Sequence, residues 1–90
     1  MRSLRSTSRF RRDAKRIKKR GYKLAKLELV IAGLRKDGKI PPSYQPHKLT
    51  GDWLGFSECH IEPDWLLIYD VTKEEVLLAG TGTHSDLFKL

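Results

Sequence analysis

The sequence predicts an α+β fold in which one curved antiparallel sheet packs on an N-terminal helical hairpin, in the element order β-α-α-β-β-β. Two segments with apolar residues at helical spacing occupy most of the first forty positions. Three segments with strand character follow, and short turns separate them. A chain of 90 residues has room for one small core, so we expect a single domain over residues 1–90 in which the helices and the sheet pack together.

The N-terminal part is expected to form a short strand and a helix. Residues 2–7 are suited to a polar strand, and Ser8 is placed to cap the helix that follows. Gly21 is a natural residue to end this helix. Its thin apolar stripe consists of Phe10, Ala14 and Ile17.

A second helix is predicted over residues 22–37, and Gly38 ends it. The two helices, joined by a tight turn, make a hairpin with one apolar side. The core-facing positions of the second helix recur at helical spacing and are Leu24, Leu27, Ile31 and Leu34.

The second half of the chain is expected to be a loop followed by a three-stranded meander. Three prolines exclude regular structure from residues 38–52. The expected strands are residues 53–61, 65–71 and 75–81, with residues 83–90 as a short tail or helical turn. Aromatic residues at alternate strand positions are core candidates, namely Trp53, Phe56, Trp65 and Tyr69.

Charge is distributed unevenly along the chain, whose net charge is +7. Residues 1–40 contain 15 Lys/Arg and 3 Asp/Glu, whereas residues 41–90 contain 3 and 8. A basic face usually indicates a polyanionic partner, and nucleic acid is the first candidate; a solvated helix face is the alternative. The basic side chains of the first helix that we expect to contact RNA are Arg11, Arg12, Lys15, Arg16, Lys18 and Lys19.

Cysteine usage and hydropathy favour the cytoplasm. The single cysteine, Cys59, cannot form an internal disulfide, which fits a reducing compartment. No apolar run approaches the roughly 20 residues needed to span a membrane. The Arg- and Ser-rich first twenty residues also resemble a transit peptide, but removing them would leave a chain of about 70 residues, near the lower limit for a stable core.

The three histidines, His47, His60 and His84, each lie at the edge of a predicted element, where functional groups tend to occur. Asp64 follows His60 by four residues across a predicted hairpin turn, so the two side chains can lie at one end of the sheet. A carboxylate there would orient an imidazole ring and favour its charged form. The alternative is that Asp64 only caps the turn.

Other kinds of site are less well supported by the residues. Three histidines and an aspartate can bind zinc or non-haem iron, but no pair has the close spacing of helical metal sites, so no metal or cofactor is expected. Cys59 is adjacent to His60 in a strand and points to the opposite face, which argues against a thiolate nucleophile. Phe88 near the C-terminus either stacks on a base or pins the tail to the sheet.

Three segments together resemble the YafQ-type toxins of the RelE superfamily. They are His-Lys-Leu-Thr-Gly-Asp-Trp-Leu-Gly-Phe from position 47, His-Ile-Glu-Pro-Asp-Trp-Leu-Leu-Ile-Tyr from position 60, and Thr-Gly-Thr-His-Ser-Asp-Leu-Phe from position 81. The resemblance implies a RelE-like microbial RNase fold and cleavage of messenger RNA in the ribosomal decoding site. It also implies a cognate antitoxin, with operator DNA as a further possible partner of the complex. The site residues it implies are His47, Glu58, His60, Asp64, His84 and Phe88.

The sequence departs from this family pattern at Gly80. Many relatives carry an arginine directly before the Thr-Gly-Thr-His run, where it would contact the scissile phosphate. Without this arginine, a protonated histidine or a basic residue such as Lys48 has to stabilise the negative charge of the transition state. The implied reaction is metal-free attack by the ribose 2′-hydroxyl, with His47 or His60 as base and His84 as acid. Two alternatives stay open: a module that binds RNA or antitoxin without cleaving, and a metalloenzyme.

Overall fold

The computed structural model describes residues 1–88 and has an α+β fold built on one five-stranded sheet. Its elements are β1 (Ser3–Ser6), α1 (Ser8–Lys19), α2 (Leu24–Asp37), β2 (His47–Lys48), β3 (Ser57–Glu62), β4 (Trp65–Val71), β5 (Glu75–Gly82) and α3 (His84–Phe88), with 3-10 turns at Pro42–Tyr44 and Gly51–Trp53. Residues 89 and 90 of the predicted tail lie outside the described residues. The predicted fold class is confirmed.

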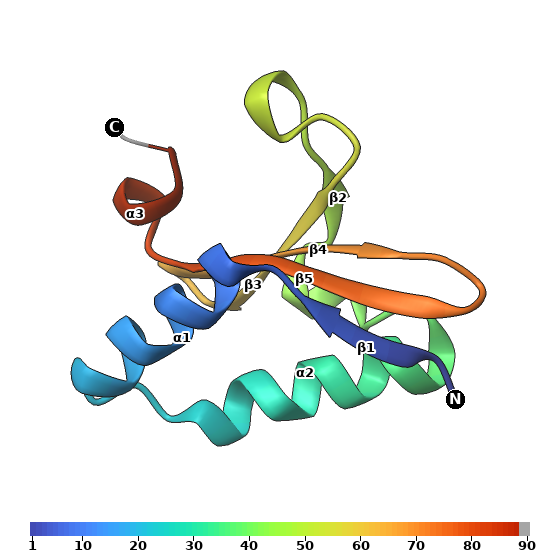
Figure 1. The fold of residues 1–90 in the computed structure, drawn as a ribbon, viewed down its shortest axis with the longest axis horizontal. Helices are drawn as coiled ribbons and strands as arrows, with labels where there is room; N and C mark the ends of the chain where they lie inside the picture. The colour runs from blue at the N-terminus through green and yellow to red at the C-terminus, as the bar shows by residue number, and fades with distance from the viewer. Residues whose placement is uncertain (89–90) are drawn as a thin grey trace.

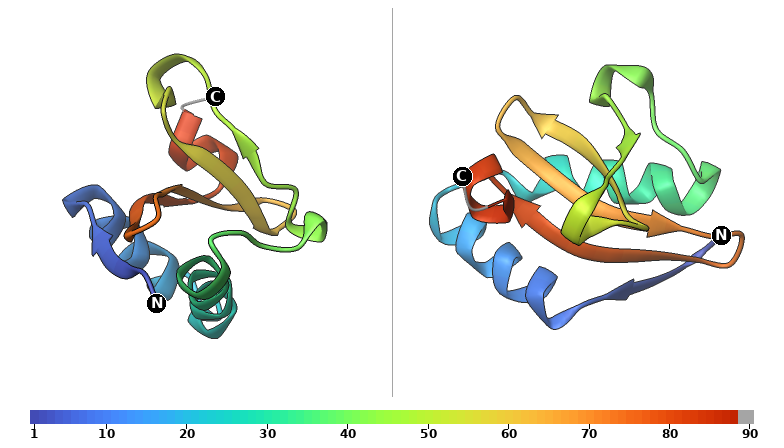
Figure 2. Two further views of the ribbon diagram at one scale, coloured as in Figure 1. Left: turned by 90° about the vertical axis from the view of Figure 1, so that its right-hand side faces the viewer. Right: turned by 90° about the horizontal axis from the view of Figure 1, so that it is seen from above.

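The strand order is β1-β5-β4-β3-β2. β3, β4 and β5 form the predicted antiparallel meander, and β2 adds to its edge in antiparallel orientation. β1 pairs with β5 in parallel, with Ser3 opposite Glu75. The helices α1 and α2 cover one face of this sheet, whereas α3 and the segment leading into β3 lie over the other (Figures 1 and 2).

Two hydrophobic clusters occupy the two faces of the sheet. On the α1/α2 side, the buried residues are Phe10, Ile17, Leu27, Val30, Leu34, Ile40, Cys59, Trp65, Leu67, Tyr69, Val76 and Leu78. The smaller cluster, under α3, consists of Leu66, Ile68, Ala79 and Leu87. β4 is buried on both faces because alternate residues point into different clusters. No helix in residues 1–88 is long and apolar enough to cross a membrane.

The helix boundaries differ from the prediction in two places. Thr7 caps α1, since its hydroxyl accepts a 3.0 Å hydrogen bond from the Phe10 N–H; the prediction of Ser8 was wrong by one residue. α2 begins at Leu24 rather than at residue 22, and Tyr22 instead packs edge-on against Trp65 with 5.0 Å between ring centroids. The predicted helix ends are confirmed: Gly21 and Gly38 adopt positive φ.

The segment before β3 also differs from the prediction. The expected strand 53–61 begins only at Ser57, because Gly51 and Gly55 adopt positive φ and the intervening chain forms a 3-10 turn. The expected loop 38–52 contains the short strand β2, which pairs with Ser57 and Glu58. Two residues are too few to give the alternation by which a strand is recognised in a sequence.

A buried carboxylate, Asp13, connects α1 to β5. Its side chain is 2% exposed, and Oδ2 accepts a 3.2 Å hydrogen bond from the Thr81 N–H. Arg9 and Arg16 on the same helix lie 3.5 and 3.4 Å from its two oxygens. Asp13 lies three residues after Phe10 and four before Ile17, so it shares the buried side of α1 with them.

Candidate active site

The three histidines come from three different elements and form a row. His47 lies in β2, His60 in β3, and His84 begins α3. The ring centroids of His47 and His60 are 6.4 Å apart, and those of His60 and His84 are 5.7 Å apart. His60 pairs in register with Leu66, whose side chain belongs to the cluster under α3. The row therefore lies on the sheet face opposite α1 and α2.

Asp64, on the turn between β3 and β4, pairs with His84. Its Oδ1 accepts a 2.9 Å hydrogen bond from the His84 backbone N–H and a second bond from Nδ1. These two bonds hold the pKa of Asp64 below its usual range. Because Nδ1 is committed to the carboxylate, Nε2 is the ring nitrogen of His84 left for substrate. The proximity argument from sequence suggested His60 as the partner; the structure places Asp64 on His84 instead.

His47 has an acceptor oxygen on each side of its ring. Nε2 lies 2.8 Å from Oε1 of Glu58, and Nδ1 lies 3.0 Å from the Gln45 carbonyl. A neutral imidazole has one N–H, so only the doubly protonated ring donates both bonds. Glu58, which faces His47 across the β2–β3 ladder, is 6% exposed. Both ring nitrogens of His47 therefore face acceptor oxygens, one of them on a buried carboxylate.

His60 has one engaged and one unpartnered ring nitrogen. Nδ1 bonds to the side-chain oxygen of Gln45, so Nδ1 carries the hydrogen and Nε2 is an acceptor. The buried side-chain polar atoms of residues 1–88 that lack a partner are Nε2 of His60 and Oε2 of Glu58. Orphaned buried polar groups are rare and often have a catalytic role. Both lie in this cluster.

Gln45 is a site residue that sequence reasoning missed. It contacts His60 through its side chain and His47 through its carbonyl. It is also the one non-glycine residue among those described that has a positive φ, 52°. A glutamine in a proline-rich loop carries no sequence signal for such a role, because its contacts depend on where β2 and β3 bring the two rings.

Phe88 closes the row at the C-terminal end. Its ring centroid is 6.4 Å from that of His84, and its side chain packs against the cluster under α3. Phe88 therefore anchors α3 and also lies beside a site histidine, while its stacking on a base stays a prediction. Cys59 points into the other cluster, and burial raises the pKa of its thiol to about 12, which argues against a thiolate nucleophile.

Asp86 fixes the start of α3 and hence the position of His84. Its carboxylate accepts hydrogen bonds of 2.7 and 3.1 Å from Arg20 and one of 2.9 Å from the Thr83 N–H. The Thr83 hydroxyl in turn accepts from the Asp86 N–H at 3.1 Å. This reciprocal arrangement is a capping box, and the pair with Arg20 ties α3 to the end of α1.

These contacts predict an acid-sensitive element of stability. The Arg20 guanidinium, followed by the Thr83 bonds, holds the pKa of Asp86 well below its usual range. A lowered folded-state pKa contributes stability that is complete above the unfolded value near 3.9 and is lost as the pH falls toward the folded value. We expect wild type to lose more stability than Asp86→Asn between pH 5 and pH 2, as measured by urea unfolding. Parallel pH profiles for the two proteins would contradict this assignment.

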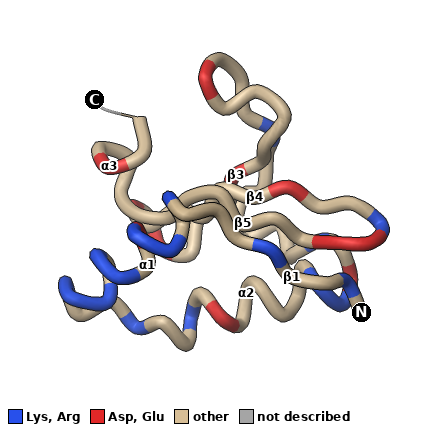
Figure 3. Tube along the Cα trace, viewed as in Figure 1, with Lys and Arg blue, Asp and Glu red and all other residues tan. Residues whose placement is uncertain are grey.

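Figure 3 shows the Lys and Arg positions of α1 on the helix side of the sheet. Arg9 is the member whose side chain reaches Trp53 and the Asp86 carbonyl. Arg11 is bonded to Ser6 and Ser8, and Arg16 pairs with Asp13 and, at 3.9 Å, with Asp86. The members that make no side-chain hydrogen bond or ion pair within residues 1–88 are Arg12, Lys15, Lys18 and Lys19. Lys48 is exposed and follows His47 in β2. Of the predicted RNA-binding residues, Lys48 is therefore the one adjacent in sequence to a member of the histidine row.

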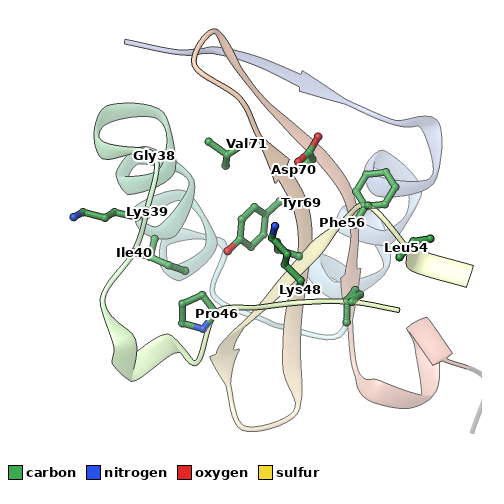
Figure 4. A pocket seen from close by; sticks show the side chains of 13 residues that line it. Gly38, Lys39, Ile40, Pro46, Lys48, Leu54, Phe56, Tyr69, Asp70 and Val71 are labelled. Carbon is green, nitrogen blue, oxygen red and sulfur yellow. The ribbon is translucent and has the colours of Figure 1, made fainter. Parts of the chain in front are cut away.

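A cavity of about 530 Å³ contains none of the histidines (Figure 4), whereas another of about 520 Å³ is lined by Gln45 and His60. Lys48 and Tyr69 line the first cavity together with Phe56 and the exposed Leu54. We assign the chemistry to the histidine row rather than to the first cavity, because three histidines meet there with Asp64 and Glu58. Within residues 1–88, no three His, Cys, Asp or Glu side chains lie close enough together to hold a metal ion.

Comparison with known proteins gives consistent matches along the chain. A family described as "bacterial toxin of type II toxin-antitoxin system, YafQ" matches residues 2–89. The mRNA interferase toxin YafQ of Escherichia coli K12 is 34% identical over 97% of this chain and 96% of its own length. In the E. coli DinJ–YafQ complex, the matching chain has a TM-score of 0.88 at 34% identity, covering 98% of this chain and 99% of that one. A metal-bound toxin from Helicobacter pylori has a TM-score of 0.87 at 36% identity, covering 98% and 100%.

Proposed function

Because the chain belongs to the YafQ family of bacterial type II toxin–antitoxin toxins, we propose that it is an endoribonuclease that cleaves messenger RNA on the ribosome. The observation that carries this proposal is the row of His47, His60 and His84, with Asp64 holding one end. Such a row can supply both a general base and a general acid to one phosphodiester, since imidazole titrates near working pH. The mRNA interferase activity named for the E. coli relative supports it.

The proposed base is His60 and the proposed acid is His84. Nε2 of His60 takes the proton of the ribose 2′-hydroxyl, and the 2′-oxygen attacks the adjacent phosphorus. Nε2 of His84 donates a proton to the departing 5′-oxygen, which leaves a 2′,3′-cyclic phosphate. Asp64 orients the His84 ring throughout. His60 is preferred to His47 as base because its Nε2 is an acceptor without a partner, although substrate must first displace the groups that cover it.

The remaining residues stabilise charge and position the substrate. The ammonium group of Lys48 offsets charge on the phosphate, in the absence of an arginine at position 80, and His47 lies beside it in β2. Phe88 offers an aromatic face to a base next to His84. The basic face of α1 contacts ribosomal RNA through its phosphates without reading sequence.

The expected cellular partners follow from the family. A cognate antitoxin neutralises the toxin, as the DinJ–YafQ complex suggests. Operator DNA is a further partner that we propose for the pair. Action on ribosomes places the protein in the cytoplasm. The competing proposal is a module that binds RNA or antitoxin without cleaving. It is motivated by Gly80, which stands where many relatives have an arginine. The two proposals differ in activity, so the decisive experiment measures activity.

Expression without a partner is expected to stop growth, because messenger RNA would be cleaved during translation. Coexpression of the antitoxin encoded by the adjacent gene should restore growth, and colony counts after induction measure both effects. His84→Ala expressed to the same soluble level is the control and should be tolerated. Normal growth at high soluble expression of the wild type would favour the binding module.

Cleavage is expected to survive chelation, because the proposed steps use only imidazole and carboxylate groups. Messenger cleavage on translating ribosomes should proceed at the same rate with and without EDTA, provided that magnesium stays high enough to keep ribosomes intact. Metal analysis of the purified protein is the matched measurement, given the metal-bound toxin from H. pylori. A stoichiometric metal whose removal abolishes cleavage would establish the metalloenzyme instead.

A further inference from the structure

A further cavity, of about 420 Å³, lies beside the end of the histidine row. It is lined by Arg9, Thr50, Asp52, Trp53, Leu87 and Phe88. Phe88 belongs both to this lining and to the row, because its ring lies 6.4 Å from that of His84. Whatever occupies the cavity is therefore a direct neighbour of a group bound at His84.

Arg9 reaches this cavity from α1 in a fixed orientation. Its guanidinium carbon lies 5.2 Å from the centroid of the Trp53 ring, Nε lies 3.5 Å from Oδ2 of Asp13, and one Nη2 hydrogen is donated to the Asp86 carbonyl at 3.1 Å. The side chain is still 38% exposed. Nη1 and the second Nη2 hydrogen make no bond to any residue from 1 to 88. A guanidinium held by three contacts thus keeps donors free for a ligand.

Arg9 shares its counter-charge with other arginines. The buried Asp13 is shared with Arg16, and Asp86 is bonded to Arg20, so three arginines face two carboxylates. Asp52 also lines the cavity, and its carboxylate can accept hydrogens from an exocyclic amine of a base.

Leu87, Asp13 and Trp53 pack closely around Gly80. A Cβ at this position would lie 3.2 Å from Leu87, 3.4 Å from Asp13 and 3.6 Å from Trp53. A longer side chain here would have to enter the space among these residues. Because position 80 has no side chain, Asp13 and Trp53 can hold the side chain of Arg9, which comes from α1, at this place.

We propose that this cavity is a subsite for one nucleotide of single-stranded RNA next to the scissile bond, with Arg9 as its phosphate-binding residue. The inference rests on the proposed ribonuclease function. Unstacked bases are bound by aromatic rings and guanidinium planes, and Arg matches phosphate geometry with two donors. Phe88 stacks on the base, Arg9 binds its phosphate, and the shared position of Phe88 sets the nucleotide against His84.

The test compares Arg9→Gln with Arg5→Gln. Both remove one positive charge, and Arg5 lies on β1, where it pairs with Glu75 at 3.2 Å. We expect Arg9→Gln to weaken binding of a short 2′-O-methyl oligoribonucleotide, which cannot be cleaved, by about tenfold, since a charged hydrogen-bond donor is lost. Arg5→Gln should change the affinity by less than about twofold. Equal losses in the two variants would overturn the subsite.

A variant-free measurement keeps the test decisive if Arg9→Gln unfolds. The chain has two tryptophans, and each gives one indole N–H signal in a nitrogen-15 spectrum. Titration with the oligonucleotide should shift the signal of Trp53 and leave that of Trp65, which is 2% exposed, unchanged. Shifts at the histidines without one at Trp53, or no shift at either, would overturn the subsite. If the protein cuts no messenger RNA on ribosomes, the proposed function is refuted. The Trp53 signal tests the subsite independently of that result, because it reports binding and not cleavage.

Discussion

Replacing His84 with alanine is expected to slow messenger cleavage by about 10²-fold or more while leaving the fold intact. The rate effect follows from loss of the proposed general acid, since a positioned acid typically contributes ~10²–10⁴-fold. The stability effect is expected to stay within about 0.5 kcal/mol, as for an ordinary surface position, because the His84 side chain is 39% exposed. The Asp64 carboxylate keeps its bond from the backbone N–H, which alanine also supplies.

Thermal melting and a ribosome cleavage assay run side by side separate these two effects. Asp64→Asn is a useful companion, because an amide can still accept the backbone N–H but no longer carries charge; its rate should fall less than that of His84→Ala. If His84→Ala melts far below wild type, the histidine has a structural role. If it melts normally and cuts at the wild-type rate, the acid is another residue, and His47 and His60 are tested next.

Replacing Asp13 with alanine is expected to destabilise the protein by about 3 kcal/mol, the largest stability effect we predict for a polar residue. The substitution leaves the Thr81 N–H without its partner in a position where Thr81 is 0% exposed. It also leaves Arg9 and Arg16 without a counter-charge, although both are partly exposed and can turn to solvent. For a domain of this size, such a loss lowers Tm by more than about 10 °C.

Asp37→Ala is the matched control, because it makes the same chemical change at an exposed position at the end of α2. We expect its Tm to stay close to that of wild type. Asp13→Asn distinguishes charge from hydrogen bonding, since the amide oxygen can still accept from Thr81. A melting temperature for Asp13→Ala that equals that of Asp37→Ala would show that the contact between α1 and β5 does not stabilise the fold.

The residues of the row could be named from the sequence, because the family motifs surround His47, His60 and His84. Their partners could not. Asp64 lies four residues from His60 along the chain, yet it bonds to His84, twenty residues away. Asp64 meets His84 because β5 runs antiparallel to β4, which brings the end of β5 back to the turn between β3 and β4.

Local patterns determined the elements themselves. The apolar run of β4, with its aromatic and β-branched residues, predicted its limits at Trp65–Val71, and Gly21 and Gly38 ended the two helices as expected. Such signals act over one or two turns of helix or one strand, so the sequence alone determined an α+β fold with a basic first half and a three-stranded meander.

The tertiary structure alone decided which distant residues meet. It pairs β1 in parallel with β5, makes a strand of His47 and Lys48, and buries Asp13 against Thr81, 68 residues along the chain. Helical periodicity predicts which face of α1 is apolar, but a carboxylate among arginines on that helix looks like a solvated surface position. Asp13 becomes buried because the Thr81 N–H of β5 needs a hydrogen-bond acceptor, and this need arises only once the sheet has formed.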